Sequence, residues 1–251
     1  MTKDNRSQHV VVRTHGGLGN QIFQILYARL LGRGREPDLV HDINYPHAFG
    51  LSAAFVGHSH PGLVGRLISA SRIPKVLEKA RLSTRGVVTL GTVTFVDGYF
   101  QDTRFYESFS SAAILDNIER LRSELRVSQQ TIHGAELHHI RLGDFFSDEQ
   151  SQRDYLTKRL QDLPDRAFII TNREDLVEAA IGSPPLEARN LSIVSSASAS
   201  ADETLRLMSE YQTIVSNDST LAFWAACLGG RQLVTPSQQL NALFAQLRGS
   251  R

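Results

Sequence analysis

The sequence contains a single cysteine, Cys227, among its 251 residues, so no disulfide can form within the chain. This scarcity is usual in proteins of a reducing compartment. No apolar run approaches the roughly 18 residues of a membrane-spanning helix, and residues 1–8 lack the apolar core of a signal peptide. Lys and Arg number 27 against 26 Asp and Glu, a net charge of +1, so no excess of positive charge favours binding to nucleic acid. We therefore expect a cytoplasmic protein that does not bind nucleic acid.

Several motifs of catalysis and cofactor binding are also missing. No two aspartates are separated by one residue, which excludes the Asp-x-Asp metal site of many sugar transferases. The sequence has neither a P-loop nor a Gly-x-Ser-x-Gly elbow. We expect no metal and no cofactor. A diphosphate bound here would be held by cationic side chains and helix ends.

Short β-branched runs alternate with helical stripes, which predicts an α/β fold with parallel sheets. In the first half the pattern predicts strands at 9–14, 38–42 and 93–96, and helices at 22–31, 62–72, 74–83 and 103–125. In the second half it predicts strands at 135–141, 167–170, 190–194, 213–215 and 231–234, and helices at 152–161, 173–181, 201–210, 219–228 and 237–248. The polar stretch 126–134 has no periodicity and is the expected linker.

A glycine-rich loop, Gly16-Gly17-Leu18-Gly19-Asn20-Gln21, follows the first predicted strand. It resembles a dinucleotide fingerprint, but Ile22 occupies the position of the third glycine, which argues against a Rossmann-type oxidoreductase. The loop places backbone N–H groups and the amides of Asn20 and Gln21 at a helix N-terminus, where an anion or a sugar can bind. A plain tight turn capped by Asn20 is the alternative.

A second polar cluster, His139-Ile140-Arg141-Leu142-Gly143-Asp144, ends the strand predicted at 135–141. Alternate strand residues share a face, so His139 and Arg141 point to one side and Ile140 and Leu142 to the other. Open α/β sheets bind ligands at this carboxyl end, and the arginine fork suits a diphosphate. A surface ion pair between Arg141 and Asp144 is the alternative. A zinc site through His133, His138 and His139 is disfavoured, because adjacent strand histidines face opposite sides.

A third segment, Ser216 to Leu228, runs from a strand through the capping residues Asp218, Ser219 and Thr220 into an apolar helix. Hydroxyls and N–H groups at such a helix start can hold a phosphate. An ordinary N-cap on a core helix is the alternative.

Together these stretches resemble glycosyltransferase family 11, the α-1,2-fucosyltransferases. The residues 16–24 resemble the family's opening Gly-Gly-Leu-Gly-Asn-Gln-x-Phe-Gln, and Gly98-Tyr99-Phe100-Gln101-Asp102 resembles its mid-chain Gly-Tyr-Phe-Gln-Asp element. His139 to Asp144 is similar to its His-x-Arg-Arg-Gly-Asp donor motif, and the stretch from Ser219 to Leu228 resembles its Ser-Thr-x-Ser-Trp-Trp-Ala-Ala-x-Leu segment. The four matches keep the family's order along the chain.

The resemblance implies a GT-B-like fold of two facing Rossmann-like domains with parallel sheets: an acceptor-side domain of residues 1–130 and a GDP-fucose-binding domain of residues 131–251. Fucose would pass from GDP-β-L-fucose, with inversion and without metal, to a hydroxyl of a galactose-containing glycan. The implied catalytic residues are Arg141, Asn20 and Asp144. The implied donor-binding residues are Gly17, Gly19, Gln21, His139, Arg141, Asp218, Ser219 and Thr220. Arg141 would bind the β-phosphate and Ser219 and Thr220 the phosphate oxygens, while Asn20 and Gln21 would meet the fucose or the acceptor.

The chain departs from the family pattern at three positions: Leu142 replaces the second arginine, Asp218 an asparagine and Phe223 a tryptophan. Strand alternation turns Leu142 away from Arg141, so its presence need not empty the diphosphate site. A catalytically inactive GDP-sugar-binding protein is the alternative function. The general base stays open among Asp144, Glu149 and Asp154.

Residues 66–85 hold six basic residues against Glu78, beside an apolar side. Such a stretch can lie on an anionic membrane, which would add a peripheral membrane contact to the cytoplasmic location. A core-facing helix pair with a solvated basic face is the favoured alternative.

Overall fold

The computed structural model describes residues 9–33, 35–41, 52, 55, 86–142, 146–184, 186–194 and 199–249. The chain divides into two compact units, of which unit 1 comprises residues 1–125 and 242–251 and unit 2 comprises residues 126–241. The last ten residues group with unit 1, whereas the sequence placed all of 131–251 in one domain. The helices expected at 62–72 and 74–83, and with them the basic stretch 66–85, lie outside the described residues.

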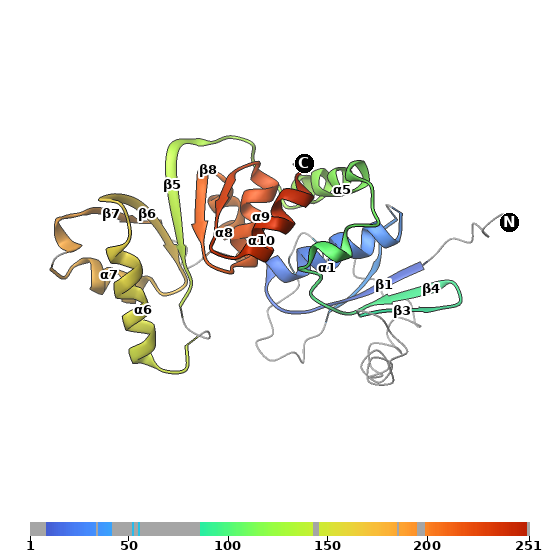
Figure 1. Cartoon of the computed structure of the whole chain (residues 1–251), viewed down its shortest axis with the longest axis horizontal. Coiled ribbons are helices and arrows are strands. Elements are labelled where there is room, and N and C mark those ends of the chain that lie inside the picture. The colour runs from blue at the N-terminus through green and yellow to red at the C-terminus, as the bar shows by residue number, and fades with distance from the viewer. Residues whose placement is uncertain are drawn as a thin grey trace. The chain divides into compact units, whose positions relative to one another are not determined.

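Unit 1 contains a sheet of four described strands in the order β2-β1-β4-β3 (Figure 1). The strands are β1 (His9–Thr14), β2 (Asp38–His41), β3 (Val87–Leu90) and β4 (Val93–Val96). The central β1 is parallel to β2 and to β4, while β3 pairs with β4 in the antiparallel direction. The parallel core places the carboxyl ends of β1 and β4 side by side.

Helix α1 (Leu18–Leu31) packs against β1 and against α5 (Ser111–Glu124). It is buried along nearly its whole length, rather than along the single stripe that the sequence predicted. Ile22, Phe23 and Leu26 in its middle are 0% exposed. Helix α1 therefore lies at the centre of unit 1. The loop that joins β1 to α1 ends on this buried helix.

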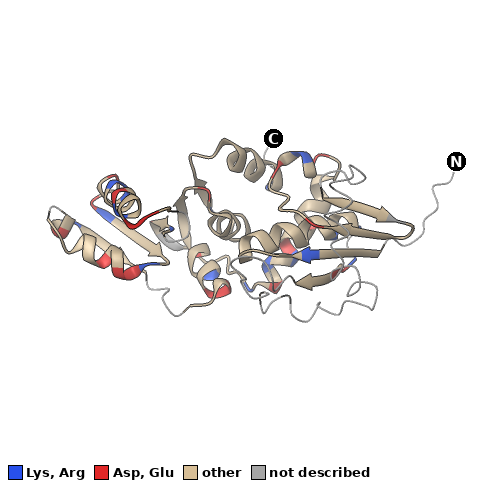
Figure 2. Cartoon of the chain, turned by 90° about the horizontal axis from the view of Figure 1, so that it is seen from below, with Lys and Arg blue, Asp and Glu red and all other residues tan. Residues whose placement is uncertain are grey.

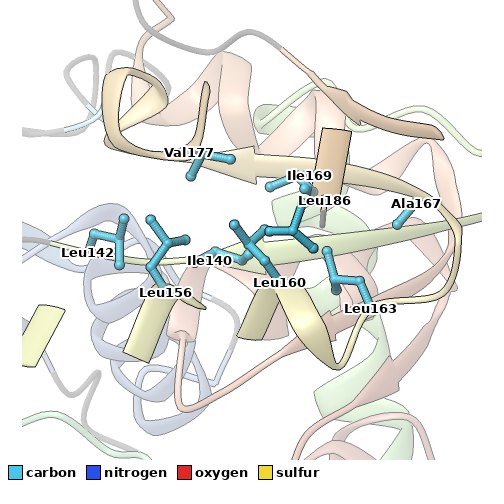
Figure 3. Packing of buried hydrophobic residues seen from close by; sticks show 9 residues of the cluster. All are labelled: Ile140, Leu142, Leu156, Leu160, Leu163, Ala167, Ile169, Val177 and Leu186. Carbon is cyan, nitrogen blue, oxygen red and sulfur yellow. The ribbon is translucent and has the colours of Figure 1, made fainter. Parts of the chain in front are cut away.

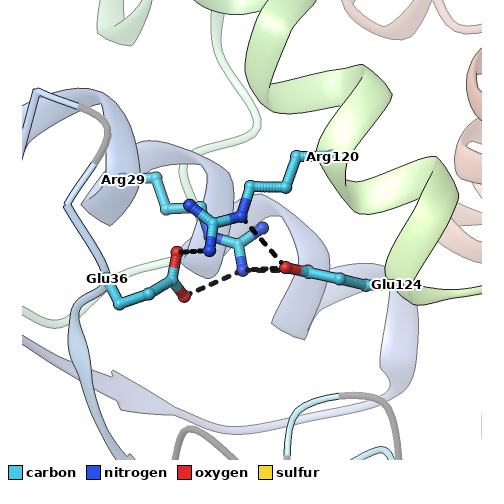
Figure 4. Close-up of polar contacts among 4 residues, drawn as sticks. All are labelled: Arg29, Glu36, Arg120 and Glu124. Atoms are coloured by element: carbon cyan, nitrogen blue, oxygen red, sulfur yellow. Dashed lines mark hydrogen bonds and ion pairs between the residues drawn. The ribbon is translucent and has the colours of Figure 1, made fainter.

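The buried Arg29 of α1 is held in a network of four charged side chains (Figure 4). Its Nη2 lies 2.8 Å from both carboxylate oxygens of Glu124 and 3.0 Å from Oε2 of Glu36. Arg120 joins the same two carboxylates, at 2.6 Å from Glu36 and 3.2 Å from Glu124. The network ties α1, the segment that leads to β2, and α5 together.

Two predictions for unit 1 need correction. The strand β3 was not expected; it forms a hairpin with β4 through Gly91, whose φ of +62° suits a residue without a Cβ. The helix expected over 103–125 is divided into a 3₁₀ turn at Thr103–Phe105 and helix α5, which begins after the N-cap Ser110. The Ser110 hydroxyl accepts a hydrogen bond from the backbone N–H of Ala113, which fixes this start.

Unit 2 contains a parallel sheet of five described strands in the order β7-β6-β5-β8-β9 (Figure 1). The strands are β5 (Ile132–Ile140), β6 (Arg166–Thr171), β7 (Asn190–Ile193), β8 (Tyr211–Ser216) and β9 (Gln232–Val234). The helices are α6 (Glu149–Gln161), α7 (Glu174–Ile181), α8 (Ala201–Ser209) and α9 (Thr220–Gly229), with α10 (Gln238–Leu247) starting in unit 2. The predicted α/β class with parallel sheets is confirmed, and each of these elements was expected within a few residues.

A hydrophobic cluster covers one face of the unit 2 sheet (Figure 3). Ile140 and Leu142 of the β5 end meet Leu156 and Leu160 of α6, with Val177 of α7 beside them. Ile140 and Leu142 are fully buried, which confirms the predicted alternation along β5. The face that carries His139 and Arg141 is the opposite one.

Acidic and basic residues both occur in α5, α6 and α8, whereas the charged residues of α7 are all acidic (Figure 2). In α6, for example, Arg153 donates to Glu149 four residues earlier at 2.7 Å. Within the residues that the structure describes, no helix has both the length and the apolar character needed to cross a membrane.

Candidate functional site

The carboxyl edge of the unit 2 sheet brings two of the sequence-predicted segments together. In the parallel pairing of β5 and β8, His139 lies directly beside Ser216. The His139 ring Nδ1 and the Ser216 hydroxyl are 3.2 Å apart, and both side chains are buried. The donor-motif strand and the segment that leads into α9 therefore end next to each other.

His139 is neutral at physiological pH. Its pKa is lowered from 6.5 to about 4, first because burial disfavours the charged ring and second because the Arg141 guanidinium repels a second positive charge. A neutral imidazole cannot supply charge to a diphosphate. The His139 ring instead forms a hydrogen bond with Ser216. The positive charge after the end of β5 is therefore that of Arg141.

Arg141 is half-buried and follows the last residue of β5. The next residue, Leu142, is anchored through its backbone: its N–H donates to the Asn172 side-chain oxygen at 2.8 Å, and its C=O accepts from the Asn172 amide at 2.7 Å. These two hydrogen bonds to Asn172, which follows β6, hold the chain in place just after Arg141. Asp144 lies outside the described residues.

The start of α9 carries the third predicted segment. Ser219 is the N-cap, and its hydroxyl accepts from the Ala222 N–H at 3.3 Å. A hydroxyl that accepts one hydrogen bond keeps a proton to donate, so capping and contact with an anion are compatible. Asn217 is held on both sides, by the Tyr155 hydroxyl of α6 and by the Thr235 hydroxyl, which donates to the Asn217 carbonyl at 3.0 Å. Asp218 and Thr220 flank this cap, so the predicted residues of the segment lie together at one helix end.

The glycine-rich loop of unit 1 connects β1 to α1. Gly16 has a φ of +75°, and a Cβ there would lie 2.7 Å from the Asn20 amide nitrogen, so only glycine fits without strain. Gly17 is the N-cap of α1, and its extended backbone lacks a side-chain cap. Gly19 lies within the first turn of the helix. The loop thus presents backbone and an amide at the N-terminus of a buried helix.

Gln21 lies beneath this loop and braces it. Its side chain is 1% exposed, its amide donates to the Gly16 carbonyl at 3.0 Å, and its oxygen accepts from the Ser52 N–H at 3.1 Å. The half-buried Asn20, by contrast, accepts a hydrogen bond of 2.8 Å from the Gln101 amide. Two segments far apart in the sequence, the glycine loop and Gly98–Asp102, therefore meet through Asn20 and Gln101.

A charged cluster that the sequence did not reveal lies at the carboxyl edge of the unit 1 sheet. Asp97, directly after β4, lies 3.3 Å from the Arg13 guanidinium and 3.4 Å from Nε2 of His15. Burial raises the pKa of Asp97, but the hydrogen bond with His15 and the charge of Arg13 outweigh it and hold the pKa below its usual value. The sequence does show that His15 follows the strand 9–14 and Asp97 the strand 93–96. Only the strand order shows that these strands are neighbours.

Two of the three candidates for the general base lie on the exposed side of α6. Glu149 pairs with Arg153 and Asp154 accepts from Gln150, both within the helix. Both carboxylates are exposed. Among the described residues, no group of three His, Cys, Asp or Glu side chains could hold a metal ion.

No family model matches the chain, and no curated protein matches it. Among solved structures, it is similar to a variant of Arabidopsis thaliana FUT1 in complex with GDP, with 13% identity over 95% of this chain and 73% of that chain and a TM-score of 0.49. It is also similar to NodZ α-1,6-fucosyltransferase from Bradyrhizobium co-crystallised with GDP, with 15% identity, 88% and 92% coverage and a TM-score of 0.44. POFUT1 in complex with GDP-fucose is similar with 11% identity over 93% of this chain and 99% of that chain, and with a TM-score of 0.39. At these TM-scores the likeness carries no argument about function, which rests on the residues of this chain.

Proposed function

We propose that the chain is a fucosyltransferase that moves L-fucose from GDP-β-L-fucose to a galactoside hydroxyl of a glycan, with inversion, without a metal ion and in α-1,2 linkage. The observation that carries the proposal is the edge of the unit 2 sheet, where Arg141 follows β5 and the capped start of α9 follows the neighbouring β8. This edge is built from two of the four segments that resemble the α-1,2-fucosyltransferases.

The chemistry of the donor explains why these groups are needed. As the bond between fucose C1 and the β-phosphate oxygen breaks, its electron pair stays on GDP and the sugar gains oxocarbenium character. The growing charge on GDP is stabilised by a preorganised guanidinium and by the N–H groups of a helix start. Arg141 would bind the β-phosphate, and Ser219 and Thr220 would donate to phosphate oxygens. The neutral His139 would bind the guanosine side or orient Arg141.

The predicted site residues of unit 1 would have two roles: some would contact a sugar, and the others would support the residues that do. Asn20, half-buried and aligned by Gln101, would meet the fucose or the acceptor. Gly17 and Gly19 would offer the backbone of the loop. The buried Gln21 would hold the loop in shape, since both ends of its amide bond within the protein.

A donor panel tests the proposal. GDP-fucose and GDP-mannose are incubated with the full chain, and hydrolysis of each sugar nucleotide is measured with and without lactose as acceptor. We expect turnover of GDP-fucose and a clear preference over GDP-mannose. A chain that turns over neither donor but binds both is the inactive GDP-sugar-binding protein, the second candidate that Leu142 favours because it replaces an arginine. If the chain neither binds nor turns over these donors, both candidate functions are contradicted.

Removal of metal is expected to leave turnover largely unchanged. The proposed site uses a guanidinium and a helix start where other transferases use an Asp-x-Asp-bound cation, so excess EDTA removes nothing that the donor needs. Initial rates of GDP-fucose turnover are compared with and without EDTA. Activity that EDTA abolishes and Mn²⁺ or Mg²⁺ restores would contradict this prediction.

A cytoplasmic location with peripheral membrane contact completes the proposal. The basic residues of 66–85 would attract anionic headgroups at about 1 kcal/mol per Lys or Arg near the surface. Membrane contact predicts that the chain sediments with vesicles that contain phosphatidylserine and is released by salt, whereas the core-facing helix pair, the favoured alternative, predicts no salt-sensitive sedimentation. Equal sedimentation with neutral and anionic vesicles would contradict the contact and leave the transferase proposal intact.

A further inference from the structure

Tyr99 is an exposed aromatic side chain at the carboxyl edge of the unit 1 sheet, with 40% of its surface accessible. Its ring stands at 87° to the His15 ring, with 4.8 Å between the centroids. His15 is itself buried, at 6% exposure, so it fixes one edge of the tyrosine. Tyr99 therefore presents a ring to solvent from an ordered support.

The backbone of Phe100, the residue after Tyr99, has a strained conformation. Phe100 has a φ of +51°, which is uncommon for a bulky residue. Its side chain is 2% exposed and stacks on Tyr27 at 4.3 Å, and its carbonyl accepts from the Tyr106 hydroxyl at 2.9 Å. Gly98 makes room, because a Cβ there would lie 3.1 Å from the Phe100 ring. Burial of Phe100 thus maintains a conformation that costs free energy, and such strain gathers at functional sites.

Asp97 adds a carboxylate on the same histidine that packs on the Tyr99 ring, since Nε2 of His15 lies 3.4 Å from Oδ1 of Asp97. Arg13 approaches its Oδ2 and His15 its Oδ1, so each oxygen has one basic neighbour. A carboxylate offers about four acceptor positions, and the Asp97 side chain is 17% exposed. Hydroxyl groups can therefore donate to it.

We propose that Tyr99 and Asp97 form a subsite for a neutral pyranose, in which the C–H face of the sugar packs on the Tyr99 ring and its hydroxyls donate to Asp97. An apolar face and hydroxyl donors on one small ring match this pair. That the sugar is the galactose of an acceptor rests on the proposed function; that unit 1 binds a pyranose does not.

The test measures binding of lactose to the full chain by saturation-transfer NMR, without any donor. Tyr99→Ala is expected to weaken lactose binding about tenfold, which corresponds to about 1.4 kcal/mol, whereas Tyr99→Phe should bind as the unmodified chain does. Leu115→Ala is the matched control, since Leu115 is equally exposed at 40% and lies in the same unit. Asp97→Asn is expected to weaken binding as well, with its fold checked by circular dichroism.

Lactose binding that is unchanged in Tyr99→Ala would overturn the subsite, and so would the absence of a lactose signal from the unmodified chain at tens of millimolar. The donor panel reports separately on the proposed function. In an active enzyme, Tyr99→Ala should raise KM for lactose by a larger factor than KM for GDP-fucose.

Discussion

Arg141→Ala is expected to lower kcat for GDP-fucose turnover by more than it raises KM for the donor. Charge-assisted hydrogen bonds to a phosphate contribute about 1.5–3 kcal/mol each in the ground state, or roughly a 10- to 150-fold loss of affinity. The loss in the transition state should be larger, because the charge on the departing GDP grows as the bond breaks. Steady-state kinetics with GDP-fucose, together with a melting curve, measure both effects.

Two neighbouring variants serve as controls for this result. Arg141→Lys should recover little, since an ammonium cannot reproduce the planar fork. Leu142→Ala should lower the free energy of unfolding by about 2–5 kcal/mol, because it truncates a fully buried side chain of the unit 2 core. Its folded fraction should turn over the donor nearly as the unmodified chain does. Near-normal turnover in Arg141→Ala would remove the diphosphate assignment.

Arg29→Met is expected to lower the free energy of unfolding by about 3–5 kcal/mol, the cost of removing one partner from a buried ion pair. The Arg29 side chain is 1% exposed, and its loss leaves Glu36 and Glu124 facing each other with Arg120 as their remaining basic partner in the network. Methionine keeps a similar volume, so the effect comes from charge rather than from a cavity. Urea unfolding followed by circular dichroism measures it.

A second substitution separates charge from packing in the same network. Arg29→Met combined with Glu124→Leu should recover much of the lost stability, because replacing a buried pair by apolar residues is often neutral. Glu119→Gln is the control in the same helix, since its carboxylate is 59% exposed and a surface pair contributes at most about 1 kcal/mol. A double variant no more stable than Arg29→Met would show that the cost lies in packing.

The sequence predicted unit 2 more completely than unit 1 for a physical reason. In unit 2 each strand is followed by a helix after a short connection, so the two periodicities alternate and mark each boundary. In unit 1 the hairpin of β3 and β4 breaks this alternation. Its signal was present, because Gly91 and Thr92 separate two β-branched runs, yet the run 87–90 was not recognised as a strand.

The candidate site followed from the sequence only where neighbours along the chain decide it. Alternation along β5 correctly separated Ile140 and Leu142, which are buried in the core, from His139 and Arg141. The pairing of His139 with Ser216 and of Asp97 with His15 depends on which strands lie side by side, and one sequence does not encode this locally. The burial of Gln21 depends on Ser52, 31 residues away.

The return of residues 242–251 to unit 1 affects how the chain is made. Unit 2 is continuous in sequence, and its last residue is synthesised before residues 242–251 of unit 1. Unit 1 is begun before unit 2 and completed after it, since Leu243 and Leu247 belong to unit 1 and are fully buried. Until they arrive, the apolar surface that they cover stays open to water and to other chains, a condition that favours aggregation during synthesis. Unit 1 therefore depends on a segment that is made after all of unit 2 to complete its core.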